Sequence, residues 1–232
     1  MNQDVALTYI KRKKRRKRAA IISGICSIAI AVFIIIAFNI FYVDRFTIST
    51  TNEPGLCLTI DEDKERTTSS LSAPPLLKAT DTQYTDIPEN VEEGLGSKNT
   101  DRYFAYSFYL GGVGEGTLIN YEMNMYLKDF SQDLEQAIKI MIIRNGVKKV
   151  YSQDGKPIYY DADRNEETKE VIGYTIPFQD NKHIILQPYS IVPGEFDKFT
   201  VVIWIDGWES VNSMKGGSFT AELKFSTLSY NN

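Results

Sequence analysis

Histidine and cysteine, the side chains that most often build catalytic and metal sites, are scarce in this chain. There is one histidine, His183, and there are two cysteines, Cys26 and Cys57. A catalytic triad needs a histidine base and a histidine-based zinc site usually needs two, so both are disfavoured and His183 is expected at the surface. Cys26 lies in a long apolar run and Cys57 outside it, which excludes a disulfide between them. We expect Cys57 to be a free thiol, with pairing to a second chain as the alternative.

A phosphate-binding loop and an excess of basic residues are also missing from most of the chain. The glycine-rich stretch 111–116 (GGVGEG) lacks the Lys-Ser/Thr ending of a P-loop and lies between two predicted strands, which indicates a β-turn. Of 26 basic and 30 acidic residues, eight basic and one acidic precede residue 44, which leaves 18 basic and 29 acidic residues after it, a net charge of −11. A region this acidic cannot neutralise the phosphates of a nucleic acid. Its charge favours cations or basic proteins as partners. We predict no enzyme activity and no nucleic-acid partner.

A basic cluster followed directly by an apolar run dominates the N-terminal part. The run 19–43 holds 25 residues without a charge, and a helix of that length extends about 37 Å, enough to cross a hydrocarbon core of about 30 Å. Cleavable signal peptides have shorter apolar regions and a small-x-small cleavage site, so an uncleaved transmembrane helix is predicted. The eight consecutive basic residues before it are Lys11, Arg12, Lys13, Lys14, Arg15, Arg16, Lys17 and Arg18.

The position of these charges predicts the orientation in the plasma membrane. Because lysine and arginine stay on the cytoplasmic side, residues 1–18 should form a cytoplasmic tail and residues 44–232 should lie outside the cell. The basic tail should attract anionic lipids, and Phe41 and Tyr42 fit the aromatic belt at the outer interface. A nucleic-acid patch is the competing interpretation of the basic cluster, and its contact with the apolar run argues against it.

Residues 44–100 have the composition of a spacer. They contain four of the eight prolines and an acidic cluster, Asp61-Glu62-Asp63, with sparse apolar periodicity. Such a segment buries too little surface to offset its ordering entropy, so we predict a flexible extracellular linker. A short strand near 55–60 is the alternative.

From residue 101 to 230 the pattern changes to alternating apolar and polar residues. The segment 117–127 alternates over its whole length, and Asn145-Gly146 between two apolar runs predicts a hairpin with strands near 138–144 and 147–152, with a helix through 144 as the alternative. The segment 198–206 is apolar on both faces, as expected for a central covered strand. A short capped helix is expected at 131–137, and further strands at 103–110, 157–160, 171–176, 182–186 and 219–226. We therefore predict a mainly β domain, a jelly-roll-like β-sandwich.

Two side-chain groups are candidates for binding. Asp161, Asp163 and Asn165 place oxygens at alternate positions, like the start of a calcium loop, but Glu166 and Ile172 stand where that loop requires Gly and Glu. A solvated acidic loop is the favoured interpretation, with a weak calcium site as the alternative. Among the aromatic residues, we expect Trp204 to fill core space between two sheets, Trp208 to pack in a loop or to act as a contact residue, and Tyr159-Tyr160 to be ordinary strand residues.

Three stretches carry a resemblance to a known family: YFAYSFYLGGVGEGTLINYEMNMYL, PGEFDKFTVVIWIDGWES and GGSFTAELKFS. Together they resemble the TasA/camelysin-type secreted proteins of Gram-positive bacteria over residues 101–228. The resemblance implies a jelly-roll domain and a role in surface fibres or biofilm matrix. Gly111-Gly112 replaces the Asn-rich turn of that group, Trp208-Glu209-Ser210 replaces an acidic segment, and the basic anchor replaces a cleaved leader. The proteolysis ascribed to camelysins is not implied, since no metal ligands match.

Two functions follow from these features. The first is a membrane-anchored surface module for adhesion, matrix or fibre assembly, with protein partners or copies of itself. The second is a scaffold component of a cell-envelope machine in division, secretion or signalling, in which the span and the basic tail bind membrane partners.

The topology is directly testable. A reporter enzyme that is active only outside the cytoplasm, fused after Asn232, should be active in intact cells, because the charge bias places the C-terminus outside. The same fusion with residues 11–18 changed to serine should lose its preferred orientation. An inactive reporter in the unaltered fusion would contradict the predicted topology.

Overall fold

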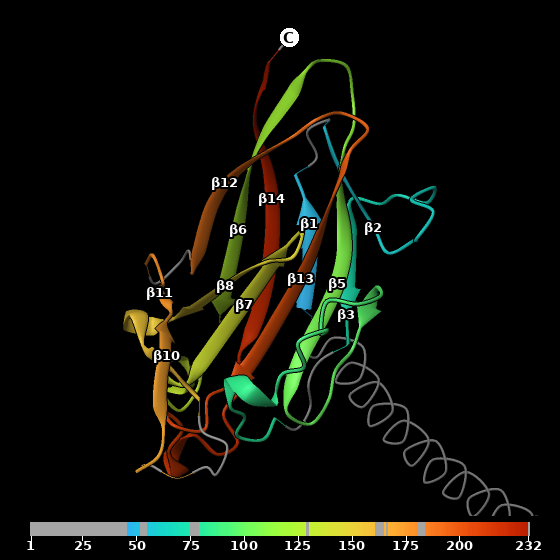
Figure 1. Ribbon diagram of the computed structural model, residues 1–232. Helices are drawn as coiled ribbons and strands as arrows, with labels where there is room; N and C mark the ends of the chain where they lie inside the picture. Colours follow the sequence, from blue (N-terminus) through green and yellow to red (C-terminus); the bar gives the residue numbers. More distant parts are fainter. Residues whose placement is uncertain are drawn as a thin grey trace, which may run out of the picture. The chain divides into compact units, whose positions relative to one another are not determined.

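The computed structural model describes residues 46–51, 55–74, 79–128, 130–160, 165, 167–180 and 184–231 (Figure 1). All of them belong to one compact unit, Asp44–Asn232. The basic residues 11–18, the predicted span 19–43 and the interface residues Phe41 and Tyr42 lie outside the described residues, so these stay predictions. Within the described ranges, no helix has the length and apolar character needed to cross a membrane.

The chain is mainly β, as the alternation predicted. A five-stranded sheet has the order β12 (Ile185–Ile191), β6 (Leu118–Lys128), β14 (Thr220–Asn231), β1 (Phe46–Thr50) and β3 (Ser70–Ala73). The second sheet has the order β11 (Ile176–Pro177), β8 (Val147–Ser152), β7 (Ile138–Arg144), β13 (Phe196–Ile205), β5 (Tyr103–Gly112) and β2 (Leu56–Thr59), with β4 (Gly96–Ser97) also paired to β5. A two-stranded ribbon joins β10 (Glu170–Tyr174) to β9 (Pro157–Tyr160). Short 3-10 turns are η1 (Tyr84–Asp86), η2 (Leu134–Gln136), η3 (Gln153–Gly155) and η4 (Asn212–Met214).

The two large sheets share one apolar core. Phe108 of β5 and Phe199 of β13 stack with ring centroids 5.7 Å apart, and Phe225 of β14 meets Phe199 edge-on at 5.2 Å. All three rings are fully buried. Because successive strand residues point to opposite faces, the alternation of apolar residues in β6 and β14 is what turns one face of the five-stranded sheet toward these rings.

The segment predicted as a linker is part of the fold. β1 pairs in parallel with β14, so that Ile48 lies opposite Leu223, and on its other side it pairs antiparallel with β3. Ile48 and Leu58 of β2 are fully buried. The prediction of a flexible linker over 44–100 is therefore wrong for the described residues of that range, and the alternative of a short strand near 55–60 is confirmed. The physical reason is that a short strand with few apolar residues becomes stable when a distant strand completes its hydrogen bonds.

Part of the same segment covers the outer face of the seven-stranded sheet. Ile87 and Val91, which follow η1, pack with Met141, Val202 and Trp204 in a second apolar cluster, separate from the core between the sheets. The prediction that β13 is covered on both faces is confirmed. The prediction that Trp204 fills space between the sheets is wrong, because its side chain is buried in the second apolar cluster, with Ile87 and Val91, on the other face of β13.

The hairpin at Asn145-Gly146 is confirmed with β7 and β8 at the predicted positions. Both turn residues have positive φ, 48° for Asn145 and 82° for Gly146, which explains why this dipeptide directs the chain back on itself. The alternative of a helix through 144 is wrong. The helix predicted at 131–137 is reduced to the single turn η2, because Ile138 and the residues after it are taken up by β7.

The role of β1 can be tested by a truncation in its middle. Ile48→Ala should lower the free energy of unfolding of the full-length protein in detergent by about 2–5 kcal/mol, since it opens a cavity in the core. Thr47→Ala changes the neighbouring exposed position and should cost well under about 1 kcal/mol. Denaturant unfolding followed by tryptophan fluorescence measures both. Equal, small effects would show that β1 does not stabilise the domain.

Candidate functional site

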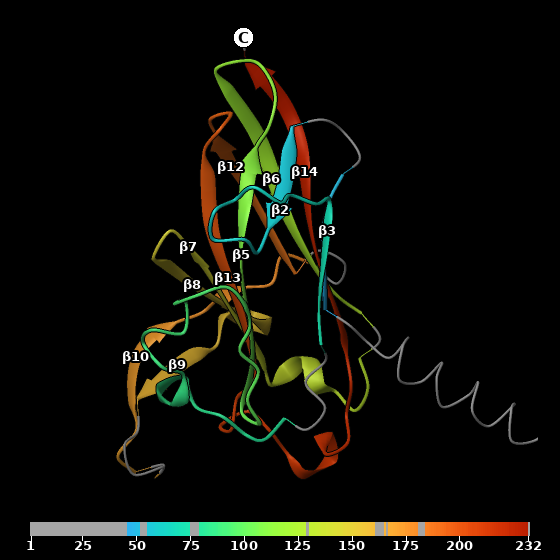
Figure 2. The same ribbon diagram turned by 90° about the vertical axis from the view of Figure 1, so that its right-hand side faces the viewer.

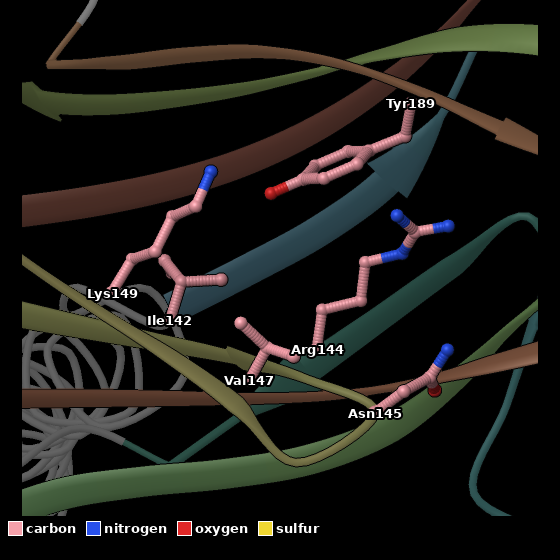
Figure 3. A pocket seen from close by; sticks show the side chains of 6 residues that line it. All are labelled: Ile142, Arg144, Asn145, Val147, Lys149 and Tyr189. Atoms are coloured by element: carbon pink, nitrogen blue, oxygen red, sulfur yellow. The ribbon is translucent and has the colours of Figure 1, made fainter.

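A pocket of about 350 Å³ lies where the β7–β8 hairpin approaches β12, the outermost strand of the other sheet (Figure 3). Its lining combines two cations, an amide, an aromatic ring and two aliphatic side chains. These are Ile142, Arg144, Asn145, Val147, Lys149 and Tyr189.

Strand register brings the lining residues together. Ile142 lies opposite Lys149, and Arg144 lies opposite Val147, so these four side chains share one face of the hairpin. Ile142 belongs to the core between the sheets, which identifies that face as the inner one. Tyr189 reaches the pocket from the opposite sheet, where it lies opposite Tyr121. The pocket is therefore the open edge of the space between the sheets.

Asp197, at the start of β13, organises one wall. Its Oδ2 accepts hydrogen bonds from Arg144 Nε at 2.9 Å, from Arg144 Nη2 at 2.7 Å and from the Tyr121 hydroxyl at 2.8 Å. Its Oδ1 accepts one from Asn145 Nδ2 at 2.6 Å. The guanidinium of Arg144 also lies 4.3 Å from the centre of the Tyr189 ring. The Arg144 side chain is 27% exposed and that of Asp197 9%, so water screens this pair only in part, and its hydrogen bonds hold the wall in one geometry.

The charge of the pocket is positive. Asp197 neutralises Arg144, whereas Lys149 Nζ donates to the amide oxygen of Gln187 at 2.9 Å, and none of the described carboxylates forms an ion pair with it. The aliphatic side chains of Ile142 and Val147 lie beside these groups. Such a lining suits a ligand that joins an anionic group to an apolar part.

Two buried tyrosines, Tyr121 and Tyr151, and the partly buried Tyr189 surround this edge, and all of them are neutral at physiological pH. Burial raises the pKa of Tyr121, and the charge of Asp197 raises it further. Burial also raises the pKa of Tyr189, although Arg144 opposes the shift. Burial raises the pKa of Tyr151, which is on the same face of β8 as Lys149, and no described group lies within hydrogen-bond distance of its hydroxyl. These hydroxyls can therefore donate hydrogen bonds, and they do not act as bases.

Of the three residues predicted for calcium, only Asn165 belongs to the described part of the chain. Asp161 and Asp163 lie outside the described residues, as does His183. Asn165 Oδ1 accepts the backbone N–H of Glu167 at 3.0 Å, the geometry of a local turn. No group of three or more His, Cys, Asp and Glu residues converges within the described ranges. The weak calcium site stays a prediction.

Cys57 and the predicted aromatic contacts have definite places. Cys57 is a buried free thiol in β2, and burial raises its pKa, with an opposing backbone hydrogen bond from Gly111. Trp208 packs edge-on against Tyr159 with ring centroids 6.0 Å apart, as the loop-packing interpretation predicted. Lys169 Nζ lies 4.4 Å from the Trp208 ring and 4.6 Å from the Tyr159 ring, so a cation covers this pair.

Sequence reasoning did not identify the pocket. The available signal was one charge at the end of an apolar row on each of two strands: Arg144 continues the inward row of β7, and Asp197 precedes the apolar run of β13. A charge in such a position needs a buried partner. The partner itself is on another strand, far away in the sequence.

Comparison with known proteins adds no relative: neither a family model nor a curated protein matches this sequence. The resemblance of residues 101–228 to TasA/camelysin-type proteins stays a prediction.

The raised pKa of buried Tyr151 predicts that the free energy of unfolding falls at alkaline pH. Above about pH 10 the unfolded chain loses a proton that folded Tyr151 retains, so the free energy of unfolding should fall by about 1.4 kcal/mol per pH unit for this residue. Tyr151→Phe should remove this part of the slope and should leave stability at pH 7 unchanged or raised by about 1 kcal/mol, because it removes an unpaired buried polar group. Denaturant unfolding between about pH 7 and 12 measures it.

Tyr174→Phe is the matched control, because it removes the hydroxyl of a tyrosine that is 72% exposed. That variant should keep the alkaline slope of the unaltered protein. If Tyr151→Phe keeps it as well, Tyr151 is not the source of the pH dependence.

Proposed function

We propose that the chain is a single-pass, membrane-anchored bacterial surface protein whose extracellular domain, a jelly-roll-like β-sandwich, acts in adhesion, matrix or fibre assembly. The basic cluster and the apolar run before residue 44 support the anchor. The acidic composition of the remaining chain supports an exposed, soluble domain that contacts proteins. The observation that carries the assembly function is an apolar strand edge.

That edge is β10. Among the described residues its only strand partner is β9, so one side of its backbone is free of strand pairing (Figure 2). Its side chains and those just after it are apolar and exposed: Val171 is 49%, Ile172 51%, Tyr174 72% and Ile176 42% exposed. Proteins usually protect such edges with charges or prolines, because a free apolar edge accepts another strand.

The occupant we propose is the same edge of a second copy. Antiparallel pairing of two β10 strands about a two-fold axis satisfies their backbone groups and brings the two apolar rows into contact. A longer assembly then needs one further contact of the same chain. Anchoring in a membrane favours such pairing, because it concentrates the copies in a plane.

Charges at this edge should prevent the association. Ile172→Lys with Tyr174→Lys should weaken self-association of the full-length protein in detergent or native membranes at least tenfold, about 1.4 kcal/mol, because like charges oppose each other across the two-fold axis. Crosslinking and analytical ultracentrifugation measure it. Leu228→Lys adds a charge at another exposed apolar position, 55% exposed in β14, and should leave association unchanged. A monomeric unaltered protein, or equal association of all variants, would contradict the assembly function.

A scaffold role in a cell-envelope machine is the second candidate, and the N-terminal sequence favours it. In that case the span and the basic tail would bind the membrane partners. Replacing residues 1–43 by a cleavable leader separates the two candidates in the same experiment: an assembly module retains its β10-dependent association after release, whereas a scaffold loses its function.

A further inference from the structure

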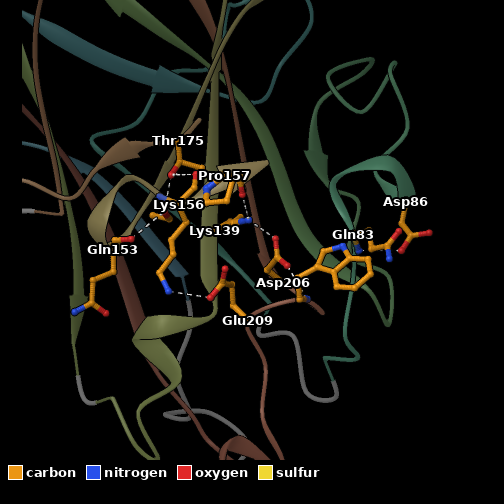
Figure 4. Close-up of polar contacts among 11 residues, drawn as sticks. Gln83, Asp86, Lys139, Gln153, Lys156, Pro157, Thr175, Asp206 and Glu209 are labelled. Atoms are coloured by element: carbon orange, nitrogen blue, oxygen red, sulfur yellow. Dashed lines mark hydrogen bonds and ion pairs between the residues drawn. The ribbon is translucent and has the colours of Figure 1, made fainter. Parts of the chain in front are cut away.

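A lysine and an aspartate are sealed together inside the outer apolar cluster. The side chains of Lys139 on β7 and Asp206 at the end of β13 are 1% and 4% exposed, and Lys139 Nζ forms an ion pair with Asp206 Oδ2 (Figure 4). The other ion pairs of the described residues are more exposed, including the pair that Lys156 forms with Glu209 nearby. Lys139 and Asp206 therefore face each other without the solvent that normally stabilises their charges.

The backbone holds the two groups in register. β7 and β13 are neighbours in the middle of the seven-stranded sheet, with Lys139 opposite Trp204. The backbone N–H of Asp206 donates to the carbonyl of Ala137 at 2.8 Å, which makes Lys139 and Asp206 diagonal neighbours on one face. The strand pairing therefore keeps the two Cα atoms in neighbouring positions.

The surrounding hydrogen bonds leave one carboxylate oxygen of Asp206 for the amine. Lys139 Nζ donates to the carbonyl of Pro157 at 3.0 Å, and Asp206 Oδ1 accepts the backbone N–H of Trp208 at 2.8 Å. Oδ2 therefore remains for the amine, while the bond to Oδ1 withdraws electron density from Cγ. The neighbouring side chains are Trp204 and Met141, both buried and part of the same apolar cluster. Both charged groups are therefore held in contact at a site from which water is nearly excluded, where an isolated charge is costly.

We propose that Lys139 and Asp206 condense to an intramolecular amide, an isopeptide bond between Nζ and Cγ. The ammonium first passes a proton to Oδ2, which leaves a neutral amine beside a carboxylic acid. The nitrogen attacks Cγ, the N–C bond forms, and the bond from Cγ to the Oδ2 oxygen breaks. That oxygen leaves as water with its own proton and a second proton from the nitrogen. The step is neither an oxidation nor a reduction, and it needs no co-reactant.

Two physical terms drive the reaction. Holding both groups in contact gives effective concentrations of about 10⁵–10⁸ M, which replaces the encounter step of an ordinary amide synthesis. The product is neutral and hydrogen-bonding, so it removes a buried charge pair from an apolar site and releases water to the solvent. The resulting crosslink ties β7 to β13, at the centre of the sheet, and does not depend on the surface function proposed above.

The mass of the protein tests this proposal. Full-length protein purified in detergent should be lighter than its sequence by one water molecule, and after denaturation and proteolysis the peptide that holds Lys139 should remain joined to the one that holds Asp206. Lys139→Arg and Asp206→Ala should each restore the sequence mass. Asp206→Asn should instead lose one ammonia molecule, because the same attack expels the amide nitrogen.

The controls separate the bond from an ordinary ion pair. Lys156→Ala removes the neighbouring, more exposed pair with Glu209 and should still show the loss of water. The decisive measurement is made on the unaltered protein, so it stands even if a variant fails to fold. An unaltered protein with the full sequence mass and no joined peptides would show that Lys139 and Asp206 form an ion pair only, and would overturn the proposal.

Discussion

The structure depends on one strand that is apolar on both faces. β13 has neighbours on both sides and must be covered above and below, because its aliphatic and aromatic residues alternate without a polar face. Its inner row, with Phe199, packs against the five-stranded sheet, and its outer row, with Trp204, packs beneath the loop that carries Ile87 and Val91. This double coverage explains why a proline-rich segment becomes part of the domain: the outer row of β13 has no other described cover.

The two ends of the same strand carry the two buried carboxylates of most chemical interest, in opposite environments. Asp197 accepts four hydrogen bonds beside a pocket that is open to solvent, and its role is to hold Arg144 and Asn145 in place. Asp206 is buried beside the outer apolar cluster and has two partners, the amine of Lys139 and the backbone N–H of Trp208. The first arrangement stabilises an ion pair and shapes a surface, whereas the second holds an ion pair almost without contact with solvent. Residue type is identical in the two cases, so the difference comes from the number of donors and from access to water.

Local patterns predicted local structure well. The hairpin at Asn145-Gly146 was predictable because both positions need positive φ and the flanking runs are apolar, and the double-sided character of β13 was visible in its unbroken apolar run. The N-terminal strands were not predictable in this way. Phe46, Ile48 and Thr50 make a weak alternating pattern, and β1 is stable because its partner β14 is at the far end of the chain. Pairing between distant segments leaves no trace in the composition of either one.

The sequence by itself determined that the chain is rich in strands, that residues 19–43 carry no charge and follow a basic cluster, and that the part after them is acidic and poor in cysteine and histidine. Each of these properties follows from residue counts or from the alternation of neighbouring residues along the chain. None of them depends on which residues are close together in the folded protein. The tertiary structure alone decided that Arg144 meets Asp197, that Lys139 meets Asp206, and that Trp204 lies outside the space between the sheets. Each of these depends on strand order and register, which place residues from distant segments in contact on one face of a sheet.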